Sequence, residues 1–259
     1  MISQEKKENT QKSIFILKKE YANIIFELAK GEGSTMTFSQ TLATIHNQPV
    51  LAKPREITLV INLKKGLDYI LDLLDEDRMK FSKYNLCAIN NLVSSDDNQD
   101  NLGDFRKGTI RIAGSKHTGV NPLIAQDAFD MLEKSFNEGP KTNEAIIKLA
   151  LNLFKHQFFG DGNKRTAQLM MNGLLVKYNF VPFVLNFNEQ KNIDALLTYY
   201  EMDEAKPLYD ICLKSQNEIK NAYQIVVGDT KKSFDQILRE VKHQNTSKQT
   251  TGPSESIKM

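Results

Sequence analysis

The sequence is short of the residues that mark several classes of protein. Among 259 residues it has no tryptophan, two cysteines, four histidines and seven prolines. Cys87 and Cys212 each lie in an apolar stretch, without close pairing or the spacing of metal ligands. We therefore expect buried, reduced thiols in a cytoplasmic protein rather than a disulfide framework.

The sequence also has only a small net charge and few long apolar runs. Lys and Arg number 34 and Asp and Glu 32, a net charge of +2, which gives no general case for binding nucleic acid or a membrane surface. The N-terminal residues are polar, and no run approaches the ~18 apolar residues that a spanning helix needs. We expect a cytoplasmic protein that binds neither nucleic acid nor membrane.

What the sequence does contain is helical periodicity, which predicts a mainly α-helical protein. The expected helices are 14–28, 38–45, 57–74, 79–93, one following the cap Asn121-Pro122, 146–154, 167–178, 193–200, 207–227 and 234–241. Residues 94–104 are a polar loop, and residues 181–187 are expected to be extended. The pattern indicates a flexible N-terminus at 1–12, one helical domain at 13–242 and a disordered tail at 243–259.

The stretch 155–166, between two of these helices, has the most specific chemistry. It offers the carboxylate Asp161, the flexible Gly162 and the cations Lys164 and Arg165 just before an amphipathic helix. Unpaired N–H groups and the helix dipole make such a helix N-terminus suited to anions. Arg165 can hold a phosphate in a bidentate fork, and Asp161 is a hard ligand for phosphate-bound Mg²⁺. The alternative is that these residues only cap a helix and face solvent.

The same stretch resembles the signature of the Fic/Doc (Fido) family, His-x-Phe-x-Asp/Glu-Gly-Asn-Gly/Lys-Arg. The residues that match this signature are Phe159, Asp161, Gly162, Asn163, Lys164 and Arg165. Two further segments are similar to the family: 32–37 resembles its Glu-Gly-Asn-Thr-x-Thr segment, and 108–114 resembles its β-hairpin flap. The resemblance implies a Fido-type helical bundle with a small flap at about 106–116 and a signature loop at 156–166.

The resemblance also implies functional roles. It implies transfer from ATP to a protein hydroxyl, of AMP or, in Doc-type members, of a phosphoryl group. Asp161 would hold Mg²⁺, and Gly162, Asn163, Lys164 and Arg165 would bind the nucleotide phosphates. A protein substrate would dock at the flap, and an antitoxin-like inhibitor or self-association fits the family.

One position departs from the signature, because Gln157 stands where the family has its histidine. An amide cannot take up a proton near neutral pH, whereas imidazole can. His156 is the neighbouring residue, ~100° away around a helix. The apolar pattern leaves open which of the two side chains faces the cleft, so both are candidate catalytic residues beside Arg165.

Two more positions bear on regulation. Many AMP-transferring members have a second arginine three residues after the loop arginine, and this chain has Gln168 there. Glu32 is the only candidate for the inhibitory glutamate of the family. The Ser/Thr expected four residues before it is Leu28, so a turn or cap role is the expectation for Glu32.

Three hypotheses follow from these residues. The chain is an ATP-dependent protein modifier, a nucleotide-binding module that has lost its base, or a Fido enzyme with another phosphate-containing donor. Gln157 favours the second hypothesis, and the intact Asp161 and Arg165 favour the first and third.

Overall fold

The computed structural model of the chain describes residues 4–94 and 102–223. The chain divides into two compact units, Met1–Ile219 and Lys220–Met259. Of the second unit only residues 220–223 are described, so the helix predicted at 234–241 and the tail predicted at 243–259 lie outside the described residues.

The first unit is built from α-helices, as the periodicity predicts. The helices are α1 (Gln4–Lys19), α2 (Tyr21–Gly31), α3 (Phe38–Ile45), α4 (Pro54–Asp75), α5 (Lys83–Val93), α6 (Ala125–Glu138), α7 (Asn143–His156), α8 (Asn163–Lys177), α9 (Gln190–Met202) and α10 (Lys206–Ala222), with a 3₁₀ turn at Pro122–Ile124. Residues 4–94 and 102–223 contain no strand, so the predicted mainly-α class is confirmed. None of the described helices combines the length and the apolar character needed to cross a membrane.

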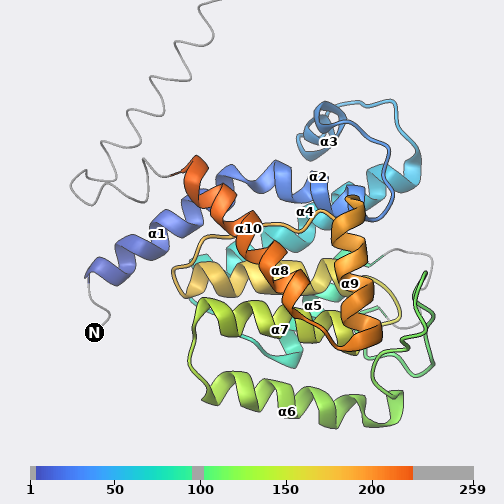
Figure 1. Ribbon diagram of the computed structural model, residues 1–259. Helices are drawn as coiled ribbons and strands as arrows, with labels where there is room; N and C mark the ends of the chain where they lie inside the picture. The colour runs from blue at the N-terminus through green and yellow to red at the C-terminus, as the bar shows by residue number, and fades with distance from the viewer. Residues whose placement is uncertain (1–3, 95–101, 224–259) are drawn as a thin grey trace, which may run out of the picture. The chain divides into compact units, whose positions relative to one another are not determined.

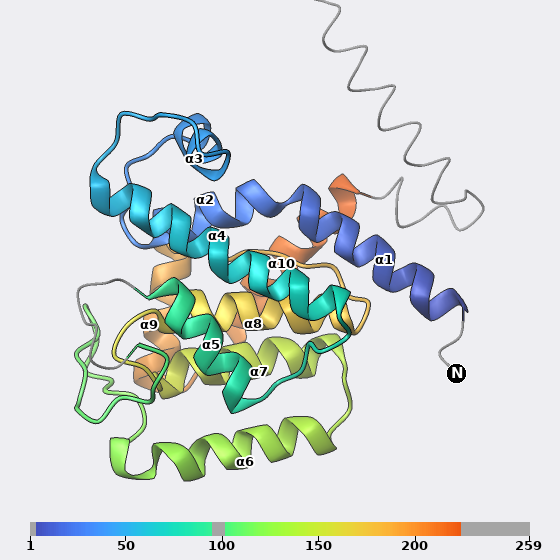
Figure 2. The ribbon, with the colours of Figure 1, turned by 180° about the vertical axis from the view of Figure 1, so that it is seen from behind.

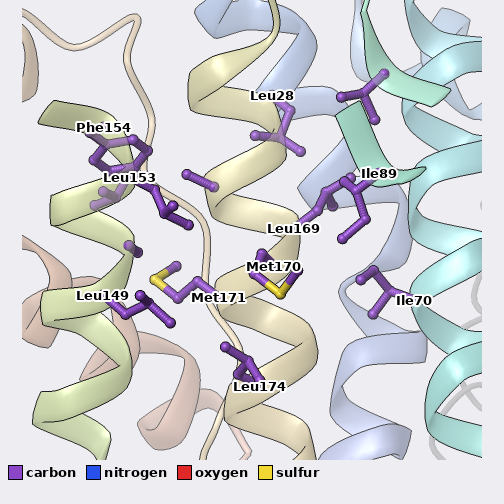
Figure 3. Packing of buried hydrophobic residues seen from close by; sticks show 14 of the residues in the cluster. Leu28, Ile70, Ile89, Leu149, Leu153, Phe154, Leu169, Met170, Met171 and Leu174 are labelled. Carbon is purple, nitrogen blue, oxygen red and sulfur yellow. The ribbon is translucent and has the colours of Figure 1, made fainter. Parts of the chain in front are cut away.

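Helix α8 is the centre of the core. Every residue from Arg165 to Val176 is buried, and α8 contacts α7, α5, α4 and α1. In Figures 1 and 2, α8 runs beside α7, and Figure 3 shows side chains of α7 on one side of α8 and Ile70 and Ile89 on the other. The two helices around the signature loop therefore pack against each other as a buried hairpin.

Short polar side chains start several of these helices. Thr142 accepts a hydrogen bond from the Ala145 N–H at the start of α7, and Ser82 does the same for α5. Asn121 accepts from the Leu123 N–H (3.0 Å) with Pro122 in the first turn, as the Asn-Pro pair predicts. These caps fix where the chain enters the elements that surround the loop.

The predicted β-hairpin at 108–114 is not formed. The segment is irregular, with one backbone bond from Ser115 N to Ile112 O (3.1 Å) and a positive φ at Gly114. The N–H of Lys116 on the returning arm donates to the Glu201 carboxylate (2.7 Å), and that of Val120 donates to His156 O (2.8 Å). Because these N–H groups donate to residues of α9 and α7, they are not available for hydrogen bonds between the two arms of a hairpin. Residues 106–116 are still called the flap.

Residues 181–186 form neither helix nor strand, and Phe187 lies in a turn, so the segment that was expected to be extended has no strand pairing. Its backbone is held by side chains of α8: Phe183 N donates to Asn172 Oδ1 (3.0 Å) and Leu185 N donates to Gln168 Oε1 (2.7 Å). Gln168, at the position of the family's second arginine, is thus a buried structural residue that faces away from solvent.

Two smaller expectations concern the N-terminus and the thiols. Helix α1 begins at Gln4, so most of the segment 1–12 that was expected to be flexible is helical. Both cysteines are free, and burial raises the pKa of Cys87 to about 11 and that of Cys212 to about 12. Unreactive thiols are the consequence.

Candidate functional site

The signature loop lies between two left-handed residues. Helix α7 ends at Gln157, which has φ 50° and ψ 58°, and α8 begins after Gly162, which has φ 74°. A Cβ on Gly162 would lie 2.8 Å from Ser94 Oγ and 3.1 Å from Asn90 Nδ2, so glycine is needed both for its conformation and for the close approach. The two left-handed residues turn the chain from α7 into α8 within a few residues.

A cavity of about 380 Å³ opens above this loop. Its floor is the loop from Gly160 to Lys164, and one wall is the flap from Ile110 to Ala113. Side chains of α9 and the end of α2 complete the lining: Ile193, Leu196, Leu197, Tyr200, Gly31 and Glu32, together with Phe187 and Gln157. The cavity is polar at the loop and apolar at α9.

The N-terminus of α8 faces this cavity without a side-chain cap. Gly162 makes no capping hydrogen bond, and the N–H groups of the first helical turn have no intrahelical acceptor. Asn163 is occupied elsewhere, because its Oδ1 accepts from Phe159 N (2.9 Å) and its Nδ2 donates to Phe159 O (2.7 Å). The side chain of Asn163 therefore holds the loop, and only its backbone can serve an anion.

Asp161 and Arg165 form an ion pair at the base of the loop. Arg165 Nη2 lies 2.8 Å from both carboxylate oxygens of Asp161, and Nη1 donates to Val93 O. Arg165 is only 3% exposed and does not line the cavity, whereas Asp161 does. Arg165 thus orients the carboxylate from behind, and its Nε is the donor without a hydrogen-bond partner.

Glu32 reaches the same charges from α2. It is the C-cap residue of that helix, as expected, and its N–H donates to Ala29 O (3.1 Å). Its carboxylate Oε1 lies 3.6 Å from Arg165 Nε and 3.8 Å from Lys164 Nζ. A carboxylate beside these cations stands where an anionic ligand would also bind.

Gln157, rather than His156, faces the cavity. The Gln157 side chain is 7% exposed, and its Nε2 donates to Phe154 O (2.7 Å) and to the Tyr200 hydroxyl (3.0 Å). Burial raises the pKa of the Tyr200 phenol, so this hydroxyl stays protonated at neutral pH. Both groups can form hydrogen bonds with a ligand, but neither can take up a proton near pH 7.

The His156 ring is engaged away from the cavity lining. Its Nδ1 lies 2.7 Å from Asn152 O, and the ring stacks on Phe158 at 5.1 Å between centroids. His117 is similarly engaged, with Nε2 2.6 Å from Lys155 O and its ring stacked on Tyr200. No histidine is found among the cavity-lining side chains within the described ranges.

Helix α5 braces the loop through residues that the sequence gave no reason to select. Asn90 Nδ2 donates to Asp161 O (2.9 Å) and to Thr166 Oγ1 (3.1 Å), and Ser94 Oγ lies 3.5 Å from the same carbonyl. Asn90 is buried on α5 together with Asn85 and the apolar Leu86, Ile89 and Val93. Its partners Asp161 and Thr166 lie 71 and 76 residues further along the chain, so no local signal marked it.

Arg106 is a second residue that sequence reasoning missed. This buried guanidinium donates to Gln157 O (2.6 Å), Gly108 O (2.7 Å) and Thr118 O (3.0 Å), and also to Val120 O. It thereby ties the flap to the end of α7. Burial lowers the pKa of Arg106, but an arginine keeps its charge at all ordinary pH values.

The donor set suits Mg²⁺ only if phosphate supplies the other ligands. The described residues hold no group of three or more His, Cys, Asp or Glu side chains placed for a metal ion. Asp161 gives one carboxylate at the cavity floor. Mg²⁺ commonly binds through one or two carboxylates together with substrate phosphates and water, so this single carboxylate fits that mode.

Sequence comparisons find relatives in the family that the loop resembles. No protein-family model matches the chain. The chain is 24% identical over 215 residues to Protein adenylyltransferase Fic of Nematostella vectensis, and 23% identical over 230 residues to Protein adenylyltransferase fic-1 of Caenorhabditis elegans. These matches cover 80% and 86% of this chain but only 49% and 44% of the relatives. The chain thus spans about half the length of the curated relatives it matches.

Solved structures agree with this result. Fic-1 (residues 134–508) of C. elegans superposes with a TM-score of 0.69 at 18% identity, covering 83% of this chain and 67% of that one. A Fic domain-containing signaling protein of Bacteroides thetaiotaomicron gives 0.67 at 15% identity, covering 86% and 92%. The chain has the fold of these proteins, and the predicted resemblance is confirmed.

Proposed function

We propose that this chain, which has the fold of Fic-domain proteins, binds ATP with Mg²⁺ over the signature loop and transfers AMP to a hydroxyl of a target protein. The observation that carries this proposal is the uncapped N-terminus of α8, which opens into a cavity that also holds the Asp161 carboxylate and Lys164. The relatives named protein adenylyltransferases support AMP as the transferred group.

Each wall of the cavity has a role in this proposal. Backbone N–H groups at Gly162 to Lys164 bind phosphate oxygens, and the apolar side chains of α9 pack on the adenine base. Arg165 positions Asp161, which holds Mg²⁺. The metal supplies charge neutralisation of the phosphates. The flap presents the target hydroxyl.

The transfer itself makes one bond and breaks one. The hydroxyl oxygen of the target attacks the α-phosphorus. The bond between the α-phosphorus and the oxygen that bridges it to the β-phosphorus breaks, and pyrophosphate leaves with that oxygen. The hydroxyl proton must pass to a base or to solvent. Gln157 can orient the hydroxyl through its Oε1, but it cannot accept the proton, so we expect slow transfer.

A second candidate function follows from the amide side chain at position 157. A nucleotide-binding module without catalysis would retain the cavity and the loop and would need no base. The engaged ring of His156 and the amide of Gln157 favour it. A Doc-type phosphoryl transfer uses the same loop and differs in which phosphorus faces the hydroxyl.

Calorimetry with ATP and Mg²⁺ tests the binding site. We expect Asp161→Ala to weaken ATP binding at least tenfold in the presence of Mg²⁺ and far less in EDTA, because the carboxylate acts through the metal. Asp104→Ala, outside the cavity lining, is the matched control and should bind as the parent does. Equal affinity of parent and Asp161→Ala would reject this site.

Substitution of Gln157 separates the enzyme from the binding module. With α-labelled and γ-labelled ATP and a cell lysate, we expect Gln157→His to raise label transfer by about 10²-fold or more, since general bases contribute on that order. His156→Ala should transfer as the parent does. If Gln157→His binds ATP yet labels no protein with either isotope, the module without catalysis is the correct function.

A further inference from the structure

A second cavity lies on the other side of the segment that precedes α9. It measures about 270 Å³ and is bounded by α2, the segment 184–189, the first turn of α9 and α10. It shares no lining residue with the cavity over the signature loop. Its volume is several times the roughly 30 Å³ that one water occupies in the liquid, so it has room for a small ligand.

Asn192 lines this cavity and carries an unsatisfied acceptor. The residue is 3% exposed, and its Nδ2 donates to Asn186 O (2.7 Å). Its Oδ1 is buried and has no hydrogen-bond partner. A buried carbonyl oxygen without a donor is rare and unfavourable, so a donor from a ligand would remove a real cost.

Glu27 presents a second such acceptor. Its Oε2 is also buried without a hydrogen-bond partner, and no ion pair is formed by Glu27 within the described part of the chain. The two lysines at the cavity are already engaged, Lys191 with Glu189 at 2.6 Å and Lys214 with Glu218 at 3.9 Å. Lys30 on the same helix offsets part of the negative charge of Glu27 and Glu189 adds to it, so negative charge remains for a cationic ligand to balance.

The same cavity has an aliphatic part. Val184, Ile211 and Ile219 line it together with the polar groups. A ligand that fits must bring a positive charge, at least two hydrogen-bond donors and an apolar body. A metal ion lacks donors and an apolar body, and the described residues offer no cluster of three metal-binding side chains.

We propose that this cavity binds an aliphatic primary amine, whose ammonium group donates to Glu27 Oε2 and Asn192 Oδ1 while its alkyl chain packs on Val184, Ile211 and Ile219. An ammonium group is compact and carries three donors, and the cavity lining offers it the two unsatisfied oxygen acceptors of Glu27 and Asn192. Burial and then the neighbouring Glu189 raise the pKa of Glu27, and Lys30 only partly offsets this rise.

The probe is n-butylammonium chloride. Its binding to the full chain is measured by calorimetry and by the shift in melting temperature. We expect saturable binding and a raised melting temperature, whereas tetramethylammonium chloride at equal ionic strength should do neither, because it has the charge but no N–H donor. Glu27→Gln should weaken butylammonium binding about tenfold or more. Glu138→Gln, which removes the same charge at the exposed end of α6, should leave it unchanged.

A second substitution is expected to strengthen the binding of butylammonium, the opposite of the effect of Glu27→Gln. Lys191→Met frees the Glu189 carboxylate at the cavity, so we expect butylammonium to bind several-fold more tightly. Equal binding of butylammonium and tetramethylammonium, or an affinity that Glu27→Gln and Lys191→Met both leave unchanged, would overturn the proposal. Neither measurement uses ATP, so failure here leaves the proposed transferase function untouched, and the converse also holds.

Discussion

The signature loop and the flap line the same cavity but are held in opposite ways. The loop is fixed from below by buried partners, with Asn90 on its backbone and Arg165 on its carboxylate. The flap has one internal backbone bond and is tied to the rest of the chain at its ends, where its Arg106 donates to Gln157 O and Glu201 of α9 accepts from the Lys116 N–H. The comparison indicates a firmly held wall on the side of the loop and a less firmly held wall on the side of the flap; in the proposed function these walls would serve the nucleotide and the target protein.

Removing an arginine from each wall gives the largest expected contrast. Arg165→Ala leaves Asp161 and Val93 O without their cation, and we expect it to lower the free energy of unfolding by about 2–4 kcal/mol. Arg111→Ala, an exposed flap residue at the cavity, should change it by less than about 0.5 kcal/mol. Urea denaturation of both variants measures the difference, and equal losses would contradict a loop that is more firmly held than the flap.

Glycine substitutions give a smaller contrast of the same kind. Gly162→Ala places a Cβ in a left-handed residue and 2.8 Å from Ser94 Oγ, so we expect a loss of about 1–3 kcal/mol. A Cβ on Gly108 would meet nothing within 4 Å, and Gly108→Ala should be neutral or stabilising by up to about 1 kcal/mol. Thermal unfolding of the two variants decides the point, and a stable Gly162→Ala would mean that the loop can shift.

The smallest expected effect concerns the anchor of the flap on α9. The hydrogen bond from Ser115 Oγ, and then that from the Lys116 N–H, lower the pKa of Glu201 from its ordinary value of 4.5. A depressed pKa means that this anchor contributes fully above pH 4.5 and is lost as the pH falls through the lower pKa of the folded state.

Hydrogen exchange at the Lys116 amide, corrected for intrinsic rates, measures the anchor. We expect its protection in the parent to fall in acid below pH 4.5, and to be low and independent of pH in Glu201→Gln. Glu204→Gln, an exposed neighbour, is the control and should behave as the parent does. Protection that is the same in the parent and in Glu201→Gln at pH 7 would show that Glu201 does not hold the flap.

The difference between the two walls also separates what could be predicted from what could not. The loop was predictable because its chemistry is local, with a carboxylate, a glycine and two cations within five residues at a helix start. The flap was predicted as a hairpin and is not one, because its backbone donors pair with Glu201 and His156, which are distant in the sequence. Likewise, nothing local pointed to Asn90 or Arg106, since all of the partners named above except Gly108 lie more than ten residues away.

The sequence by itself determined the helices, their buried faces and the corner with Asp161, Gly162 and two cations at the start of α8, since periodicity, capping and the chemistry of adjacent residues act over a few positions. Only the tertiary structure decided which of His156 and Gln157 faces the cavity. The left-handed end of α7 turns Gln157 toward Tyr200, while Phe158 takes the His156 ring. Neighbouring side chains on a helix end are distinguished by what packs against them, and that depends on residues far away along the chain.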